Sequence, residues 1–339
     1  MTTTAARLPA ILIAAFGLTL AVGVLPARAD EKPAPRVKFV FVGDIMLDRD
    51  PGRYMLAGGD PFASVAKLLD GADFAVGNLE CVVAKGGKRA DKFFTFRADP
   101  KAIPHLAVHF AAVSLANNHT GDFGHEALIE TMDLLGNGGV QYFGAGRNSK
   151  EAHRPWVAES DGVRVAVLGY NEFRPRTFEA GPTTPGCAWS VDEQVVADIK
   201  AARAEADVVI TFMHWGQEYK FPPNDRQKAL ARTMIDAGAD VVIGNHPHVV
   251  EGAEYYKKKL IVYSLGNFVF DEYKDDPPIL KEERRVGWAL RLTLGKTGLV
   301  EWDTVVTRTD DDGIPRLDPA GVGPSGKAGS DVISVGKAR

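Results

Sequence analysis

The stretch Val241-Val242-Ile243-Gly244-Asn245-His246-Pro247-His248 places two histidines one residue apart, directly after an apolar run that is typical of a buried strand. A glycine and a proline hold the two imidazoles on a short, rigid turn. Neutral imidazole is the commonest side-chain metal ligand, and two of them on one fixed turn can approach an ion without rearranging the backbone. The stretch therefore predicts a central strand with a metal-binding unit at its carboxyl end.

Four other apolar runs end in the same way, with a coordinating side chain at the carboxyl end. The endings are Gly43-Asp44 after 37–42, Asn78-Leu79-Glu80 after 73–77, Asn117-Asn118-His119 after 112–116, and His214 after 208–213. In open α/β sheets, ligands bind beyond the carboxyl ends of the strands, where loops and helix N-termini meet. Five such endings in one chain indicate that they converge on a single site.

The pattern between these runs alternates strands with helices. Helical periodicity covers 61–69, 103–110, 125–135, 191–204 and 227–237, and runs rich in β-branched residues include 163–168 and 260–263. Such alternation predicts βαβ units and a sheet that is at least partly parallel. A terminal antiparallel hairpin is predicted for 286–294 and 299–307, and the charged segment 271–285 before it is expected to be an exposed loop.

The two ends of the chain differ in composition from its middle. Residues 1–29 combine an apolar run with Ala27-Arg28-Ala29 before Asp30, which predicts a signal peptide; an uncleaved N-terminal membrane anchor is the alternative. Residues 30–36 are predicted to be a linker, and residues 37–308 a single domain. Residues 309–339 are rich in Asp, Gly, Pro and Ser and are expected to be a disordered tail. The protein is thus expected to be exported, to the periplasm or outside the cell.

Charge and cysteine content bound the function further. The 339 residues carry a formal net charge of -4, which becomes -6 when the signal peptide and its two arginines are removed. No nucleic-acid partner is expected, because such binding needs an excess of basic residues on one face. The basic run 257–259 lies between two predicted strands and is interpreted as a solvated turn. Cys81 and Cys187 could pair after export or remain two inert buried thiols.

The converging side chains are suited to metal chemistry. Carboxylate and amide oxygens mixed with imidazole nitrogens favour Mn, Fe or Zn over an all-oxygen calcium site. The set is large enough for one or two divalent ions, and a carboxylate can bridge a pair. Its members are Asp44, Glu80, Asn118, His119, His214, His246 and His248. Taken singly, Asp44 could be a helix cap and Glu80 a surface charge, but packing alone rarely explains a pair such as His246 and His248.

Six motifs, in one order, resemble the CapA-type capsule synthesis family, which is associated with poly-γ-glutamate production and has a calcineurin-like metallophosphoesterase fold. They are Gly43-Asp44-Ile45-Met46-Leu47, Gly77-Asn78-Leu79-Glu80, Ala116-Asn117-Asn118-His119, His214-Trp215-Gly216-Gln217-Glu218-Tyr219, His246-Pro247-His248 and Tyr263-Ser264-Leu265-Gly266-Asn267-Phe268. The resemblance implies an α/β fold, a metallophosphoesterase-like two-sheet β-sandwich flanked by helices. It also implies metal ligation by six residues, with His119 as the leaving-group acid. The six are Asp44, Glu80, Asn118, His214, His246 and His248.

One departure from the superfamily pattern lies at Met46. Metallophosphoesterases usually open with Asp-x-His, whereas Asp44-Ile45-Met46 supplies a thioether, which is a poor ligand for hard divalent ions. Glu80 would occupy the bridging position that an aspartate takes in the superfamily. One of two metal positions is therefore expected to be weaker than the other.

The resemblance implies an exported, metal-dependent hydrolase-like protein that acts in the production or processing of capsule poly-γ-glutamate. The substrate would be an anionic polymer attacked at a γ-amide, or a phosphoester, because activated water attacks either. The alternative is a non-catalytic factor that binds the polymer and helps a membrane-bound capsule synthase to assemble or export it. Met46 favours this alternative, whereas the negative net charge disfavours passive binding of a polyanion.

The predicted signal peptide gives a first test. The exported protein is expected to begin at Asp30, because signal peptidase cuts after a small-x-small motif. N-terminal sequencing of the protein recovered from the periplasm or medium measures this directly. A membrane-retained protein that still begins at Met1 or Thr2 would support the anchored alternative.

Overall fold

Two β-sheets pack face to face. Their central strands carry apolar side chains on both faces, one toward the other sheet and one toward the helices. In β1 (Val37–Ile45), Phe39 and Phe41 belong to the core between the sheets, whereas Val40 belongs to the core under the helices. Successive side chains of a strand point to opposite faces, so a strand covered on both faces must be apolar throughout. This is why the apolar runs of the sequence are continuous rather than alternating.

The computed structural model describes residues 1–2, 4, 34–174, 176–271, 276–329 and 333. The described residues from Pro35 onward form one compact unit. The predicted signal peptide and most of the predicted linker lie outside the described residues. No helix within the described ranges is long and apolar enough to cross a membrane.

The first sheet has the strand order β18-β17-β16-β1-β2-β5-β6, with β15 paired to the end of β1. Strands β1, β2, β5 and β6 run parallel, and β16, β17 and β18 add antiparallel to them in turn. The bounds beyond β1 are β2 Phe74–Leu79, β5 Ala112–Ser114, β6 Gln141–Phe143, β15 Asn267–Val269, β16 Val286–Gly295, β17 Gly298–Thr309 and β18 Pro315–Lys327.

The second sheet has the order β13-β14-β12-β11-β9-β8. Its four middle strands are parallel, and β13 and β8 pair antiparallel at the two edges. The bounds are β8 Trp156–Ser160, β9 Val163–Asn171, β11 Val208–His214, β12 Val241–Asn245, β13 Val250–Tyr256 and β14 Lys259–Leu265. Two short pairs complete the strands: β3 Val82–Val83 with β4 Arg97–Ala98, and β7 Ala145–Gly146 with β10 Gly186–Cys187.

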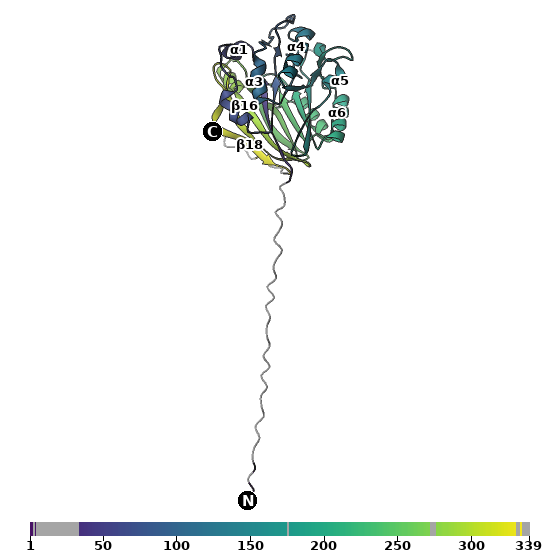
Figure 1. The fold of residues 1–339 in the computed structure, drawn as a ribbon, viewed down its shortest axis with the longest axis vertical. Coiled ribbons are helices and arrows are strands. Elements are labelled where there is room, and N and C mark those ends of the chain that lie inside the picture. Colours follow the sequence, from purple (N-terminus) through teal and green to yellow (C-terminus); the bar gives the residue numbers. More distant parts are fainter. Residues whose placement is uncertain (3, 5–33, 175, 272–275, 330–332, 334–339) are drawn as a thin grey trace. The chain divides into compact units, whose positions relative to one another are not determined.

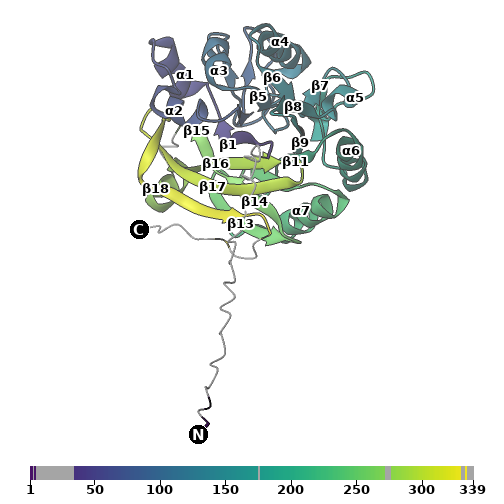
Figure 2. The ribbon, with the colours of Figure 1, turned by 60° about the horizontal axis from the view of Figure 1, so that its bottom comes forward.

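Helices cover the outer face of each sheet, which gives helix, sheet, sheet and helix layers. Apolar residues of α1 to α4 pack on the first sheet, and those of α6 and α7 pack on the second. Figure 2 shows α1, α3 and α4 on one side of the strands and α6 and α7 away from them. The bounds are α1 Arg49–Leu56, α2 Ala66–Leu69, α3 Ala102–His109, α4 Gly124–Asn137, α5 Ser149–Ala152, α6 Asp192–Glu205, α7 Asp225–Ala237 and α8 Pro278–Arg285, with 3-10 turns at Ala63–Val65 and Arg176–Phe178.

The predicted α/β class, a two-sheet β-sandwich flanked by helices, is confirmed. The predicted terminal hairpin forms as β16 and β17, and the basic run at 257–259 includes the turn between β13 and β14. The predicted loop at 271–285 is wrong in its second half, where α8 forms with Pro278 in its first turn. Proline is tolerated there because its missing N–H has no partner in a helix start.

The prediction of a disordered tail from residue 309 is also wrong over Pro315–Lys327. This segment forms β18, which pairs antiparallel with β17 and is drawn in yellow at the edge of the sheet (Figure 1). The strand has few apolar side chains, so its composition gave no strand signal. Pairing with the backbone of β17 and the ion pair of Arg308 Nε with Asp318 Oδ2 at 3.1 Å hold it instead.

The two cysteines remain free, so the buried-thiol interpretation is confirmed and the disulfide is not formed in this structure. Cys81 packs in the core under α1 to α4, and Cys187 lies in the short strand β10. Burial raises the pKa of the Cys187 thiol to about 12 and the pKa of the Cys81 thiol still further. Both thiols are therefore protonated and weakly nucleophilic at neutral pH.

Candidate metal centre

All seven predicted site residues come together where the carboxyl ends of the two sheets face each other. The strands that deliver them are β1, β2 and β5 of the first sheet and β11 and β12 of the second. Six of the seven side chains are buried, and Asn118 is half-buried. In chain order they are Asp44, Glu80, Asn118, His119, His214, His246 and His248. Residues up to 204 positions apart thus form one polar cluster in an otherwise apolar interior.

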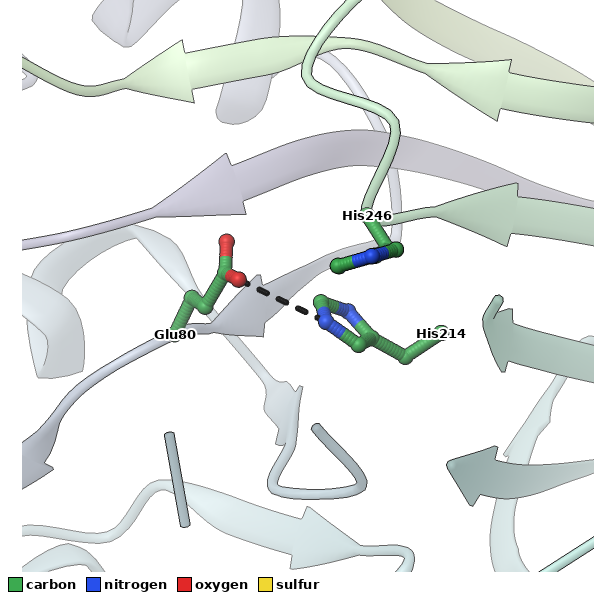
Figure 3. Close-up of side chains that lie close together, drawn as sticks. All are labelled: Glu80, His214 and His246. Atoms are coloured by element: carbon green, nitrogen blue, oxygen red, sulfur yellow. Dashed lines mark ion pairs between the residues drawn. The ribbon is translucent and has the colours of Figure 1, made fainter. Parts of the chain in front are cut away.

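One group of ligand atoms forms around Glu80, His214 and His246, whose side chains converge from three separate strands (Figure 3). Glu80 Oε1 lies 3.4 Å from His214 Nε2, and the three ligand atoms lie within 4.8 Å of one another. Asn118 Oδ1 lies 2.8 Å from the same His214 nitrogen. Two imidazoles, one carboxylate and one amide oxygen therefore face a common point.

A second group forms around Asp44, Glu80 and His248. His248 Nδ1 lies 3.3 Å from Asp44 Oδ2 and 4.0 Å from Glu80 Oε2. The ligand atoms of these three residues also lie within 4.8 Å of one another. Glu80 belongs to both groups, with one oxygen directed to each, which is the geometry of a carboxylate shared between two positions.

The hydrogen bonding of these residues fits a divalent metal. Both carboxylate oxygens of Glu80 and both ring nitrogens of His246 are buried without a hydrogen-bond partner among the described residues. A buried polar group without a partner is costly, and a buried charge more so. Burial and the neighbouring Asp44 carboxylate raise the pKa of Glu80, whereas burial and the neighbouring histidines lower the pKa of His214. Neutral imidazoles beside carboxylates with free lone pairs form a donor set suited to a transition metal.

The turn that carries the two histidines has a strained backbone. His246 has φ 97° and His248 has φ 59°, a region that non-glycine residues rarely occupy. Gly244 lies against the backbone oxygen of Tyr263 and Nε1 of Trp215, so a Cβ at this position would clash with both. Strain of this kind costs about 1–3 kcal/mol per residue and persists only where the surroundings hold it. Gly244 and Pro247 therefore belong to a rigid turn that fixes the positions of the two imidazoles.

His119 is held by residues that the sequence analysis did not select. Its Nδ1 lies 2.6 Å from Asp122 Oδ2, and the other oxygen of Asp122 lies 2.6 Å from Lys92 Nζ. The His119 Nε2 then faces Glu80 Oε1 at 3.9 Å. Burial lowers the pKa of His119 to about 4, against the opposing effect of Asp122. The spacing of three residues between His119 and Asp122 was the available signal for this pair.

Asn78 and Asn117 connect the strand ends beneath the site. Asn78 Nδ2 donates to Asp44 Oδ1 at 2.7 Å and lies 3.1 Å from His214 Nδ1, so it links the two sheets. Asn117 Nδ2 donates to Asn78 Oδ1 at 3.1 Å. Such partners orient ligand side chains and are a regular part of metal sites. Both amides stood in the quoted motifs, but only the fold shows which groups they contact.

Met46 and Glu218 bear on the predicted set of metal ligands. Met46 is buried in the apolar core, where its sulfur lies 3.2 Å from the backbone nitrogen of Asp48. Glu218, by contrast, has a carboxylate oxygen within 4.8 Å of ring nitrogens of His246 and His248. Its turn is tied to the histidine turn, because Tyr219 N donates to Pro247 O at 2.8 Å. Glu218 lay in a quoted motif without being assigned to the site.

The fold is an α/β sandwich, and its polar site has one carboxylate between two groups of histidines. These two features define a class of protein with a candidate metal centre between two sheets. Residues 38–272 match the family model described as bacterial capsule synthesis protein PGA_cap, and the chain belongs to this family. It is 37% identical over 242 residues to the PGA biosynthesis protein CapA of Bacillus subtilis, a match that covers 68% of this chain. It is 34% identical over 273 residues to the capsule biosynthesis protein CapA of Bacillus anthracis, covering 77% of this chain.

These matches span 63% and 66% of the two relatives' own lengths. Among solved structures, a hypothetical protein from Thermus thermophilus has a TM-score of 0.50 at 17% identity. That alignment covers 79% of this chain and 98% of the other. At this identity the likeness concerns the fold alone.

The histidine turn gives a test of metal binding. The double change His246→Ala/His248→Ala is expected to remove bound transition metal and to lower the thermal stability of the metal-loaded protein. A ligand that binds only the native state stabilises it by RT ln(1 + [L]/Kd), so the stability difference should disappear after both proteins are stripped with chelator. Elemental analysis and thermal melts measure the two effects. Equal metal content in variant and wild type would contradict the assignment.

Proposed function

We propose that this chain is an exported, metal-dependent, hydrolase-like protein of capsule poly-γ-glutamate production or processing. The observation that carries the proposal is Glu80, which is fully buried, has no hydrogen-bond partner at either oxygen among the described residues and faces a histidine group on each side. The names of the two Bacillus relatives support the capsule and poly-γ-glutamate context. Export rests on the predicted signal peptide.

Each ligand residue receives a role from its position. Asp44, Glu80 and His248 would hold one divalent ion, and a second group would hold another, with Glu80 shared. That second group is Glu80, Asn118, His214 and His246. Mn, Fe and Zn all suit such mixed oxygen and nitrogen ligands. The chemistry that bound divalent ions supply is activation of water, together with stabilisation of developing negative charge.

His119, whose lowered pKa leaves the ring neutral, is proposed to accept a proton from the attacking water and to transfer it to the leaving group. Asp122 holds the Nδ1 side of the ring at 2.6 Å, which turns Nε2 toward the metal-binding residues. Packing of the ring against Phe96, with centroids 4.3 Å apart, restricts its rotation. A positioned histidine of this kind commonly contributes a factor of about 10²–10⁴ to the rate. The leaving group would come from a γ-amide or a phosphoester.

A non-catalytic role is the second candidate, and one observation favours it. Met46 keeps its sulfur in the apolar core, so the Asp44 group lacks the imidazole that a metallophosphoesterase usually has there. Such a protein would bind the anionic polymer through its metal and assist a membrane-bound capsule synthase. Turnover separates the two candidates, because only the hydrolase releases product from poly-γ-glutamate or a phosphoester.

His119 gives the test of catalysis. His119→Ala is expected to retain bound metal and to lose turnover by about 10²–10⁴-fold, because proton transfer is removed while the ligands remain. His125→Ala is a matched control, since His125 lies on α4 outside the cluster. Elemental analysis and hydrolysis rates are measured on both variants. Loss of metal in His119→Ala would make His119 a ligand, and a wild type without turnover on either substrate class would favour the assembly factor.

Met46 gives the test of unequal metal positions. The wild type is expected to bind one ion tightly and a second weakly, because the Asp44 group has a thioether in place of an imidazole. Met46→His should strengthen the second binding event in a calorimetric metal titration. Met46→Leu keeps an apolar side chain at the position and should leave the titration unchanged. Two equally tight ions in the wild type would show that another residue already completes the site.

A further inference from the structure

One segment beside the candidate centre has a charge opposite to that of the whole chain. Residues 85–97, here called the basic segment, contain five basic residues and one acidic residue, whereas the chain has a net charge of -4. The basic residues are Lys85, Lys88, Arg89, Lys92 and Arg97. A local excess of one sign raises the concentration of an oppositely charged partner near it. The basic segment therefore offers an anion-attracting surface that the net charge conceals.

The basic segment is hydrogen-bonded to Asp122, the residue that positions His119. The backbone nitrogen of Ala90 donates to Asp122 O at 2.8 Å, and that of Phe96 donates to the Asp122 carboxylate at 2.6 Å. Lys92 Nζ pairs with the same carboxylate at 2.6 Å and donates to Asn118 O at 2.8 Å. These four contacts, made by Ala90, Lys92 and Phe96, place this part of the basic segment next to His119 and Asn118.

The outer part of the basic segment faces solvent. Lys85, Lys88 and Arg89 are exposed, and Phe93 is 87% exposed. Neither Lys85 nor Lys88 forms an ion pair with a carboxylate among the described residues. Four acids belong to the basic segment or bond to it: Asp91 lies within it, Asp122 binds Lys92, Glu130 of α4 accepts a hydrogen bond from the Lys85 backbone nitrogen at 3.0 Å, and Asp48 accepts one from the Arg97 backbone nitrogen at 2.8 Å. Five basic residues against these four acids leave the local charge positive.

We propose that the basic segment is the docking surface for a polycarboxylate chain, which runs across it toward His119. This inference rests on the proposed function and narrows its substrate to an extended anionic polymer rather than a small phosphoester. A single exposed ion pair contributes little binding free energy, so a row of spaced cations selects a ligand with many repeated carboxylates. Exposed Phe93 adds an apolar contact for the methylene groups between those carboxylates.

The experiment measures binding directly and does not depend on turnover. Fluorescently labelled poly-γ-glutamate is titrated with metal-stripped full-length protein, and anisotropy is followed at low and at physiological ionic strength. The test variant is Lys85→Glu/Lys88→Glu. The matched control is Lys200→Glu/Lys296→Glu, which changes the net charge equally on the exposed face of α6 and in the turn between β16 and β17. That turn lies at the end of β1 opposite to Asp44.

The wild type is expected to bind the long polymer more tightly than γ-linked di- or triglutamate, with an affinity that falls as salt rises. The test variant should lose at least about tenfold in affinity for the long polymer at low ionic strength, and the control should stay within about twofold. Equal loss in both variants, or no loss in the test variant, would overturn the docking surface. Tighter binding of inorganic polyphosphate of equal charge would overturn the assignment to a polycarboxylate.

Failure of this proposal is distinguishable from failure of the proposed function. Polymer binding that requires bound metal and ignores the two lysines would overturn the docking surface while leaving the metal centre intact. Polymer binding by stripped protein that depends on Lys85 and Lys88 supports it, even if the His246→Ala/His248→Ala variant shows that no metal is lost.

Discussion

The carboxylate of Glu80 imposes the main constraint on this structure. It lies fully inside the protein with neither oxygen hydrogen-bonded to a described residue, and the Asp44 carboxylate nearby makes its ionised form still less favourable. A buried charge is tolerated when it is paired or coordinates a metal. A ring nitrogen of His214 lies 3.4 Å from one of its oxygens and a ring nitrogen of His248 lies 4.0 Å from the other, but neither histidine forms a hydrogen bond with the carboxylate. The cluster is therefore an arrangement that a divalent cation would complete.

The fold places this cluster by packing two sheets face to face, so that the carboxyl ends of their parallel strands lie together. Asp44 and Glu80 come from the first sheet, and the histidines of β11 and β12 come from the second. The core between the sheets fixes their separation, because Phe41 and Phe212 pack with ring centroids 5.7 Å apart. Asn78 then bridges Asp44 and His214 across the same gap. Apolar packing sets the distance, and amide hydrogen bonds set the orientation.

Local backbone strain refines the geometry that the layers provide. The positive φ angles of Tyr219, His246 and His248 occur on two turns joined by the hydrogen bond from Tyr219 N to Pro247 O. Gly244 allows β12 to approach Tyr263 and Trp215 closely, and the Trp215 indole donates to Tyr263 O at 2.9 Å. Strained residues that neighbours hold in place are typical of ligand-binding turns. The same turns bring a carboxylate oxygen of Glu218 within 4.8 Å of ring nitrogens of His246 and His248.

The sequence by itself determined the class of the fold and seven residues of the polar cluster, but not Glu218 or Asp122. Continuous apolar runs such as Val241-Val242-Ile243, which alternate with helical segments and end at turn residues, indicate strands covered on both faces, and ligands bind beyond the carboxyl ends of such strands. Only the tertiary structure decided the pairing of Glu80 with both histidine groups and the attachment of Lys92 to Asp122. It also decided that Pro315–Lys327 is a strand. Hydrophobic periodicity indicates which face of a segment is buried. It does not indicate which distant segments come into contact, or whether a polar segment pairs through its backbone with the edge of a sheet.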